Sequence, residues 1–407
     1  MERIKPTQKQ LDFMDWEMGV FFHFGIRTFY PENNDWDGKE MELSEFNPTE
    51  LDCEQWIKTV KDAGATYAIL TCKHHDGFAN WPSRYTEYSV KNTPWKDGRG
   101  DVVKEFVDAC RKYNVKVGLY YSPAQFGSVK MQGREYDDYF INQISELLKN
   151  YGKIDYLWFD GCGSENHEYD RDRIVKVIRE LQPEILIFSM WDPDVRWVGN
   201  EEGIVPLGCK NVVQSANISV LEQEAQWLSE PRFLPYECDC KIRRKSWFYK
   251  KSDEKYLRSP NELIDLYYYS VGRGGNLLLN IAPDDKGLLP KRDSKNFLEF
   301  GKKIKERFAE PVECEITREN DEYILTLPEE KKINHMVIEE DLTDGEAVRE
   351  FEISTVTPCG DVGIYSGKMI GHKRICEFRS WTGERFKLKI TDSDGEYKIR
   401  SIKLYMI

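Results

Sequence analysis

Several signatures of common protein classes are missing from this chain. No run of apolar residues approaches the roughly 20 that span a bilayer. No Gly-x-Ser-x-Gly motif is present, which disfavours a serine hydrolase with a nucleophile elbow. No glycine-rich phosphate loop opens an early helix, which disfavours a nucleotide-binding sheet. The ten cysteines are scattered, and the close pair Cys238 and Cys240 lacks the spacing of metal ligands.

Positive charge is also scarce relative to negative charge. The chain has 58 Lys and Arg against 71 Asp and Glu, a formal net charge of −13. An acidic surface disfavours nucleic acid and anionic membranes as partners. The N-terminal residues show no apolar stretch behind their charges, so no secretory signal is predicted. Many cysteines without a signal favour a cytoplasmic location, although a secreted protein trimmed of its signal would look the same. The sequence does not predict an oligomeric state.

Aromatic residues are abundant, with 11 Trp, 22 Tyr and 20 Phe making up 13% of the 407 residues. Such rings fill large cores, and they also provide the flat surfaces on which sugar rings stack. A chain of this length is too long for one small core, so we expect two domains.

Strand and helix patterns alternate over the first half of the chain. Continuously apolar strands separated by helices indicate a parallel sheet covered by helices. We therefore predict an α/β fold, a (β/α)8-like TIM barrel, for residues 1–310, with an open doubly wound sheet as the alternative. Apolar runs predict strands at 19–23, 66–72, 115–121, 154–159 and 185–189, and amphipathic patterns predict helices at 54–63, 102–113, 136–151 and 171–181.

The pattern changes near residue 310. Beyond Pro311 helical periodicity ends, and short alternating runs such as 323–327 and 386–390 are separated by turn signals such as Asp344-Gly345. These features predict an antiparallel β-sandwich for residues 311–407. This domain could bind glycan, pack against the barrel or complete the pocket with a loop, and we expect structural support because its exposed aromatic residues are few.

Polar residues follow the predicted barrel strands. His23 ends the first strand, residues 73–76 (Lys-His-His-Asp) follow the second, Tyr121 ends the third, and Asp160 follows the fourth. Barrel enzymes gather their catalytic residues at the carboxyl ends of the strands. This distribution favours the barrel and predicts the active site at that end.

Asp160 is either a structural cap for the next helix or a catalytic carboxylate. A retaining glycosidase needs two carboxylates about 5 to 5.5 Å apart, one to attack and one to donate a proton. Asp160, on a rigid strand end, suits the attacking role. Spacing alone does not choose the proton donor among Glu201, Glu202 and Glu237. The carboxylates expected near the rim are Asp160, Asp192, Asp194, Glu201, Glu202, Glu237 and Asp239.

The histidines His23, His74 and His75 also have more than one interpretation. They can be metal ligands, structural groups, or neutral imidazoles that exchange hydrogen bonds with sugar hydroxyls. Adjacent residues such as His74 and His75 project in different directions, and no further histidine lies nearby in the sequence. The sequence therefore favours sugar hydroxyls, and we predict neither a metal nor a cofactor.

Five segments together resemble the α-L-fucosidases of glycoside hydrolase family 29, and they occur in the family's order. The run 334–342 resembles the start of that family's C-terminal β-domain. The resemblance implies a retaining mechanism through a covalent fucosyl-enzyme, with Asp160 as the nucleophile. It also implies that His23, His74 and His75 bind fucose hydroxyls and that Tyr121 and Trp158 line the pocket. The segments are 22–25 (Phe-His-Phe-Gly), 73–78 (Lys-His-His-Asp-Gly-Phe), 119–122 (Leu-Tyr-Tyr-Ser), 158–161 (Trp-Phe-Asp-Gly) and 272–280 (Gly-Arg-Gly-Gly-Asn-Leu-Leu-Leu-Asn).

Two further segments resemble the subfamily selective for α-1,3/1,4-linked fucose. The Gly-Asn-Glu sequence at 199–201 implies that Glu201 is the acid/base. The segment that carries Glu237, Arg243 and Trp247 implies substrate-binding roles for these three. The chain has Arg-Lys-Ser at 244–246, before Trp247, where the subfamily has Pro-Gly.

The sequence thus predicts an exo-acting, retaining α-L-fucosidase that releases terminal α-1,3/1,4-linked fucose from fucosylated, Lewis-type oligosaccharides. The alternatives are a broad-specificity α-L-fucosidase, a fucose-binding protein with little turnover, and a metal-dependent hydrolase that uses His23, His74 and His75.

Overall fold

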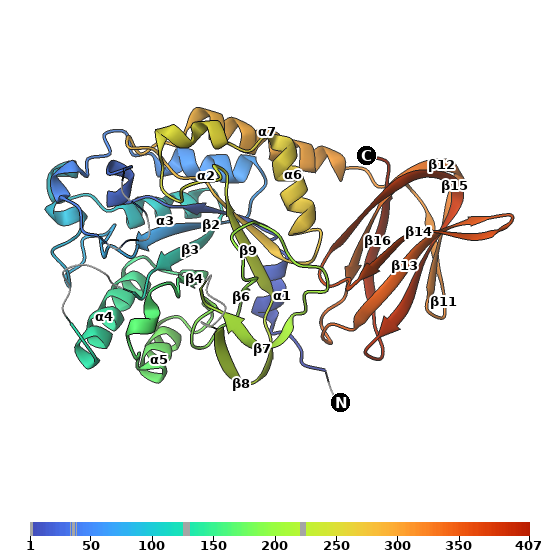
Figure 1. The fold of residues 1–407 in the computed structure, drawn as a ribbon, viewed down its shortest axis with the longest axis horizontal. Coiled ribbons are helices and arrows are strands. Elements are labelled where there is room, and N and C mark those ends of the chain that lie inside the picture. Colours follow the sequence, from blue (N-terminus) through green and yellow to red (C-terminus); the bar gives the residue numbers. More distant parts are fainter. Residues whose placement is uncertain (1–2, 33, 35–36, 38, 125–130, 220–224) are drawn as a thin grey trace.

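The computed structural model describes residues 3–32, 34, 37, 39–124, 131–219 and 225–407. Two domains lie side by side along the long axis of the molecule, a mixed α/β domain and a smaller all-β domain (Figure 1). Within the described residues, no helix has both the length and the apolar character needed to cross a membrane.

Eight described strands form a parallel barrel in the N-terminal domain. Each strand is parallel to its neighbours, and β1 pairs with both β2 and β10. A parallel bridge between Phe188 and Val195 closes the ring between β5 and β6. This arrangement confirms the predicted (β/α)8-like barrel. In ring order the strands are β1 (Met18–Phe22), β2 (Tyr67–Lys73), β3 (Lys116–Tyr121), β4 (Tyr156–Phe159), β5 (Leu186–Phe188), β6 (Arg196–Trp197), β9 (Tyr236–Lys241) and β10 (Asn276–Asn280).

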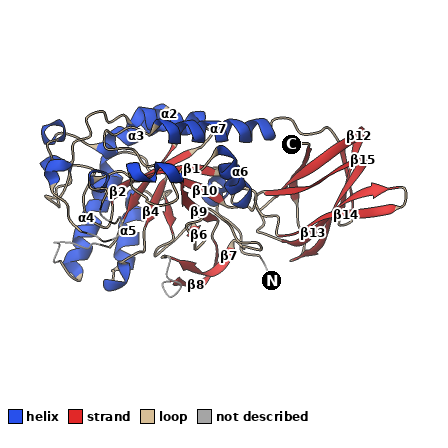
Figure 2. Ribbon diagram, turned by 45° about the horizontal axis from the view of Figure 1, so that its top comes forward, coloured by secondary structure: helices blue, strands red, loops and turns tan. Residues whose placement is uncertain are grey.

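Helices cover the outside of the barrel (Figures 1 and 2). Their inner faces carry apolar residues at helical spacing, as Trp56, Ile57 and Val60 do in α2. The Asp52 carboxylate accepts the Gln55 N–H and so caps the start of α2. The long helices are α2 (Cys53–Asp62), α3 (Val102–Lys112), α4 (Arg134–Asn150), α5 (Arg171–Leu181), α6 (Pro260–Tyr269) and α7 (Lys291–Arg307), and short 3-10 helices are η1 (Ile26–Phe29), η2 (Leu43–Glu45), η3 (Val90–Asn92), η4 (Trp95–Gly98), η5 (Ser164–Asn166) and η7 (Lys251–Tyr256).

A tight turn, rather than a helix, joins β5 to β6. Ser189 and Trp191 in this turn have φ values of 55° and 61°, in the left-handed region that a reversal this short requires. After β6 the chain forms the antiparallel hairpin of β7 (Val212–Asn217) and β8 (Ala225–Phe233), which extends the sheet away from the ring. The helical layer is therefore interrupted on this side of the barrel.

Helix α1 (Gln8–Met14) closes the amino-terminal end of the barrel. Phe13 packs edge-on against Tyr156 in the barrel interior, with ring centroids 5.4 Å apart. The Gln10 amide donates to the main-chain carbonyls of Asp194 and Phe233. Because this end is plugged, the carboxyl end is left for the site.

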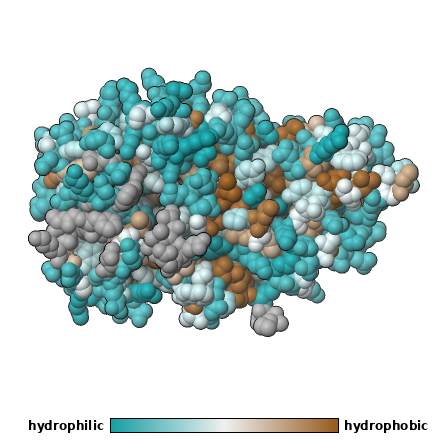
Figure 3. Space-filling view, in the orientation of Figure 1, coloured by the Kyte–Doolittle hydropathy of each residue, from teal (hydrophilic) through white to brown (hydrophobic). Residues whose placement is uncertain are grey.

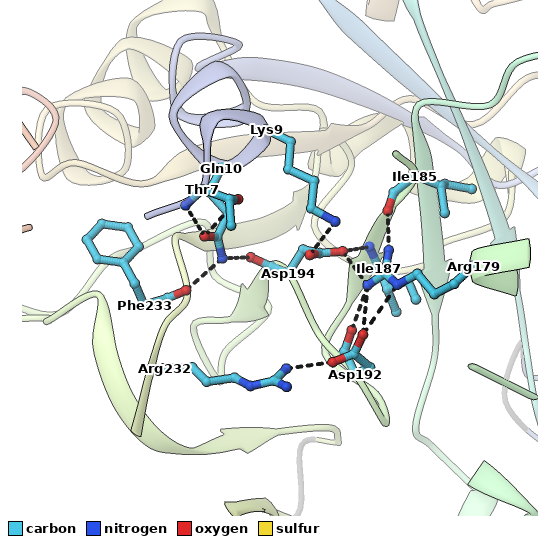
Figure 4. A network of polar contacts seen from close by, with 10 residues as sticks. All are labelled: Thr7, Lys9, Gln10, Arg179, Ile185, Ile187, Asp192, Asp194, Arg232 and Phe233. Carbon is cyan, nitrogen blue, oxygen red and sulfur yellow. Dashed lines mark hydrogen bonds and ion pairs between the residues drawn. The ribbon is translucent and has the colours of Figure 1, made fainter. Parts of the chain in front are cut away.

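Asp192 and Asp194, which the sequence grouped with the rim carboxylates, belong to a structural ion-pair network (Figure 4). Asp194 binds Lys9 at 2.7 Å and Arg179 at 2.8 Å, and it accepts the Ile187 N–H. Asp192 binds Arg179 and Arg232. Their charges tie α1 and α5 to the turn between β5 and β6, which explains why two carboxylates fall so close together in the sequence.

The C-terminal domain is an antiparallel β structure with its own core. Phe351, Phe386 and Leu388 are buried in this core, which is separate from the barrel core. The two longest strands carry register shifts, as between Thr326 and Lys331, and such bulges bend strands over a core. The predicted sandwich is confirmed, and the predicted boundary at 310/311 falls between α7 and the first strand. The strands are β11 (Glu315–Glu319), β12 (Glu322–Glu340), β13 (Val348–Thr357), β14 (Gly360–Lys368), β15 (Arg374–Ser393) and β16 (Ile399–Tyr405).

Candidate active site

Asp160 stands directly after β4 at the carboxyl end of the barrel. The next residue is Gly161, where an added Cβ would lie 2.1 Å from the main-chain oxygen of Ile218. Only glycine fits this approach, so the chain turns away at once. The Asp160 side chain retains 23% of its exposure, in contrast to the buried strand before it. The sequence Asp-Gly after an apolar strand therefore presents a carboxylate at the rim.

Two donors fix the orientation of the Asp160 carboxylate. The Tyr120 hydroxyl donates to Oδ2 at 2.7 Å, and the Cys162 N–H donates to Oδ1 at 2.9 Å. His75 Nε2 lies 3.5 Å from the same Oδ2. With one donor on each oxygen, the carboxylate is held in a single rotational position. Asp160 caps neither of the two described helices that follow it, because the short helix η5 begins after Gly163 without a side-chain cap and α5 takes its cap from Asp170.

Three histidines face this carboxylate or its neighbours. His75 Nδ1 lies 2.6 Å from the Ser122 hydroxyl, and His23 Nδ1 lies 2.8 Å from Asn280 Oδ1. The His74 ring lies 4.3 Å from that of His75 and 5.7 Å from that of His23. His74 Nδ1 is buried and has no hydrogen-bond partner among the described residues. A ligand hydroxyl that reached this nitrogen would satisfy it.

Burial keeps these imidazoles neutral. It lowers the pKa of His23 to about 3, and it lowers the pKa values of His74 and His75 as well. The nearby charge of Asp160 acts in the opposite direction on His75. A neutral imidazole offers one donor and one acceptor, which matches a sugar hydroxyl.

A stack of aromatic rings supports the pocket from below. Tyr120 lies between His74 and Trp158, with centroid separations of 5.5 and 5.4 Å, and Trp158 stacks on Phe188 at 4.2 Å. Trp158 is 7% exposed, so it contributes more to the support than to the open surface. The stack fixes the ring whose hydroxyl contacts Asp160.

Glu237 lies beneath this stack, inside the barrel. It is fully buried and accepts hydrogen bonds from the Tyr67 hydroxyl at 2.6 Å and from Trp158 Nε1 at 2.9 Å. Burial raises the pKa of Glu237 to about 7, although these hydrogen bonds oppose the rise. Glu237, which was predicted to bind substrate, is thus enclosed within the barrel and contacts the aromatic stack through Trp158.

Tyr121 and Arg243 do not reach the Asp160 carboxylate. Strand side chains alternate, so Tyr121 faces the helices, where its hydroxyl donates to Gln143 at 2.6 Å. Tyr120 takes the pocket position predicted for Tyr121. Arg243 is bound through two nitrogens to Asp293 on α7, at 2.7 and 2.9 Å, and is 6% exposed. Its charge is committed to this buried ion pair.

Glu201 and Trp247 are joined through Lys241. The Lys241 ammonium lies 2.8 Å from Glu201 Oε2 and 4.3 Å from the centroid of the Trp247 ring. Trp247 stacks on His23 at 4.9 Å. Glu201 thus connects to His23 through three successive contacts. The Glu201 side chain is 35% exposed, and Glu202 lies exposed on the surface.

A second buried carboxyl group lies close to Glu201. Asp239 accepts a hydrogen bond from Trp197 Nε1 at 2.7 Å. Burial raises the pKa of Asp239 well above its ordinary value, and the charge of Glu201 raises it further. Asp239 and Lys241, two residues apart on the same face of β9, therefore set the electrostatic surroundings of Glu201.

A metal ion is the other ligand that this cluster can be tested against. Ligand atoms of His74, His75 and Asp160 all lie within 4.8 Å of one another. This set differs from the predicted one, because it contains Asp160 in place of His23. Both oxygens of Asp160 already accept hydrogen bonds, from the Tyr120 hydroxyl and the Cys162 N–H, so the one carboxylate of the set is directed toward other partners. The surroundings therefore suit neutral hydroxyls better than a metal.

Three polar residues of this site were not predicted from the sequence. They are Tyr120 on Asp160, Asn280 on His23 and Lys241 on Glu201. The sequence does carry a signal for Tyr120, because side chains alternate along a strand and Tyr120 and Tyr121 must therefore face opposite sides. Trp158, two residues before Asp160, faces inward on the next strand. Lys241 and Asn280 also end strands, β9 and β10, whose identity was not predicted.

Comparison with known proteins places this arrangement in a family. A family model described as alpha-L-fucosidase matches residues 2–307. An Arabidopsis thaliana protein named alpha-L-fucosidase 1 is 38% identical over 304 residues, which are 72% of this chain. This chain spans 59% of the length of that relative.

Two solved structures share the whole architecture. One is a glycoside hydrolase 29 family member from a rumen bacterium, with a TM-score of 0.90 and 32% identity, covering 100% of this chain and 78% of that one. The other is a Ruminococcus gnavus GH29 fucosidase in complex with fucose, with a TM-score of 0.84 and 25% identity, covering 99% and 95%. The similarity extends over both domains.

Proposed function

Because the chain belongs to the α-L-fucosidase family, glycoside hydrolase family 29, we propose that it is an exo-acting α-L-fucosidase with a retaining mechanism. Its substrates are branched oligosaccharides of the Lewis type that carry terminal α-1,3- or α-1,4-linked fucose. The observation that carries the proposal is the Asp160 carboxylate, held by Tyr120 and the Cys162 N–H among three neutral histidines.

In the first step Asp160 attacks the anomeric carbon of fucose. A bond forms between a carboxylate oxygen and C1, and the bond from C1 to the glycosidic oxygen breaks. The donors on Oδ1 and Oδ2 keep the carboxylate from rotating, so the entropy of orienting the nucleophile is already lost before substrate binds. The product of this step is a covalent fucosyl-enzyme.

Glu201 is the proposed acid/base. It protonates the departing glycosidic oxygen, and the resulting carboxylate then takes a proton from the water that releases fucose. The Glu201 side chain is partly exposed, so solvent and the leaving group can reach it, and the Lys241 ammonium holds it in position. Burial and then the charge of Glu201 raise the pKa of the neighbouring Asp239, so Asp239 is held protonated and adds no second negative charge beside the proposed acid/base.

The histidines recognise the fucose hydroxyls in this proposal. His74 Nδ1 is the clearest position, because it is buried without a partner and a hydroxyl would satisfy it. Trp247 offers the apolar ring for the opposite side of the sugar, next to His23. Linkage preference rests on the Gly-Asn-Glu sequence at 199–201, which resembles the α-1,3/1,4-selective subfamily.

The test is a comparison of rates on two substrates. We expect kcat/KM to be higher for a Lewis trisaccharide than for a chromogenic aryl fucoside. A protein that cleaves the aryl fucoside faster would be a broad-specificity α-L-fucosidase. A protein that binds fucose in calorimetry but cleaves neither substrate would refute the catalytic proposal.

A further inference from the structure

A second groove lies between the barrel and the C-terminal domain, and it shares no lining residue with the Asp160 site. Its volume is about 650 Å³. Apolar side chains gather along the seam between the domains on the face shown in Figure 3. The barrel side of the groove contributes the end of α6 and the turn after it, and the other side contributes β13, β14 and β15. Its central residues are Tyr268, Tyr269, Arg273, Phe351, Tyr365 and Arg374.

Two arginines meet in this groove. The main chains of Arg273 and Arg374 form an antiparallel bridge across the domain junction. Arg374 is 5% exposed; its Nη2 donates to the Tyr365 hydroxyl at 3.1 Å, while its buried Nε has no partner. Arg273 donates to the Val205 carbonyl at 2.7 Å and lies over the Tyr269 ring at 4.7 Å. Among the described residues, neither guanidinium has a carboxylate within the 4.0 Å of an ion pair.

This arrangement is electrostatically unfavourable when the groove holds no anion. Burial lowers the pKa of Arg273, and the charge of Arg374 lowers it further. Two like charges in a partly desolvated groove repel each other, and a buried cation without a counter-ion loses hydration energy. An anion between the two guanidinium groups would remove both costs.

The acidic residues of the groove do not fill that role. Glu350 faces Lys368 at 3.9 Å, and Glu352 and Glu377 are exposed. These carboxylates stand at the rim and leave the arginines uncompensated. They would also repel large polyanions, so the groove suits a ligand with a single negative group.

We propose that this groove is a second carbohydrate-binding site, which holds an acidic sugar residue through Arg273 and Arg374. The planar guanidinium fork binds carboxylate and sulfate groups through paired hydrogen bonds. The exposed Tyr269 and the neighbouring Tyr365 provide rings for the sugar itself. This proposal depends on the proposed function in one respect, because it assumes that the negatively charged group belongs to a glycan.

The experiment measures binding to the full chain by calorimetry in the presence of saturating fucose. The probes are 3′-sialyllactose for a carboxylate, galactose 6-sulfate for a sulfate, and lactose as the neutral control. We expect one or both acidic probes to bind and lactose not to bind. Arg273→Met and Arg374→Met should each weaken binding by about tenfold or more, while Arg379→Met, which removes an exposed arginine from the same strand as Arg374, should not.

Hydrolysis of an aryl fucoside by the same variants separates this site from the Asp160 site, and its rate should stay within about twofold of wild type. Binding of neither acidic probe, or binding that both groove variants leave unchanged, would overturn the proposal. Loss of hydrolysis in the wild type would refute the catalytic proposal instead. If Arg374→Met does not fold, the partly exposed Arg273→Met carries the test.

Discussion

The Tyr120 hydroxyl donates a hydrogen bond to Asp160 Oδ2 across 2.7 Å. The adjacent Tyr121 points to the other side of the same strand and donates to Gln143 on α4. Two neighbouring tyrosines thus have separable roles, one at the proposed nucleophile and one in the layer between barrel and helices.

Tyr120→Phe removes one of the two donors on the Asp160 carboxylate. Hydrogen bonds to charged groups contribute about 1.5 to 3 kcal/mol, so kcat should fall by about 10- to 100-fold. Steady-state kinetics on an aryl fucoside measures this effect. Circular dichroism and thermal denaturation establish that the variant is folded.

Tyr121→Phe is the matched control. It leaves Gln143 without its partner in a buried layer, so we expect a loss of about 1 to 3 kcal/mol in the free energy of unfolding. Activity per folded molecule should stay near that of wild type. Equal losses of kcat in the two variants would contradict the assignment of Tyr120 to the pocket.

Lys241→Met removes the positive charge beside Glu201. The 2.8 Å contact that positions the proposed acid/base is then lost, so kcat on a Lewis trisaccharide should fall by about tenfold. Steady-state kinetics measures this effect, and thermal denaturation establishes that the variant is folded. Lys241→Arg keeps a cationic donor and should retain most of the activity; an unchanged kcat in Lys241→Met would show that Lys241 does not position Glu201.

Glu237→Gln tests the buried carboxyl group under Trp158. The pKa of Glu237 is about 7 in the folded chain against an ordinary 4.5, so the folded state binds the extra proton between these values. The stabilisation that the protonated Glu237 contributes is fully present below about pH 4.5. As the pH rises to about 7 that stabilisation is lost, and the free energy of unfolding falls by about 3 kcal/mol in total.

The glutamine variant lacks this titration. Its free energy of unfolding, relative to that of wild type at the same pH, should therefore rise by about 3 kcal/mol between pH 4.5 and 7. Urea denaturation at several pH values measures the difference and cancels the titration of all other groups. A difference that does not vary with pH would contradict the raised pKa.

Removal of metal ions should leave activity unchanged. Both oxygens of Asp160 already accept hydrogen bonds, and a neutral hydroxyl suffices for the free nitrogen of His74. Hydrolysis of an aryl fucoside after exhaustive chelation, with elemental analysis of the treated protein, checks this expectation. Activity that is lost on chelation and restored by one added metal would support the metal-dependent alternative.

The barrel and its site end were predictable from the sequence because their signals are local. The apolar strands up to 185–189 are continuous, and polar residues such as His23 and Asp160 follow them directly. The second half of the barrel gave weaker signals. Strand β6 has two residues and follows a turn with Ser189 and Trp191 in left-handed conformations, so no strand–helix alternation marks it.

The site residues that were misplaced depend on side-chain direction. Tyr120 and Tyr121 have the same chemistry, and only the parity of the strand separates them. Arg243 and Glu237 each find a buried partner that lies far away in the sequence, Asp293 on α7 and Tyr67 on β2. Such pairings are set by the folded barrel, and no local pattern reports them. The cytoplasmic location stays a prediction.

The central claim is that Asp160 forms a covalent bond to fucose, and trapping the intermediate tests it most directly. A 2-deoxy-2-fluoro-fucosyl fluoride should label the protein at one site per chain, because the fluorine at C2 slows both formation and hydrolysis of the intermediate while the fluoride leaving group speeds only its formation. Peptide mass spectrometry should place the label on Asp160, and Asp160→Asn should not be labelled. A label on another carboxylate, or rapid turnover that yields the inverted sugar without any label, would contradict the account.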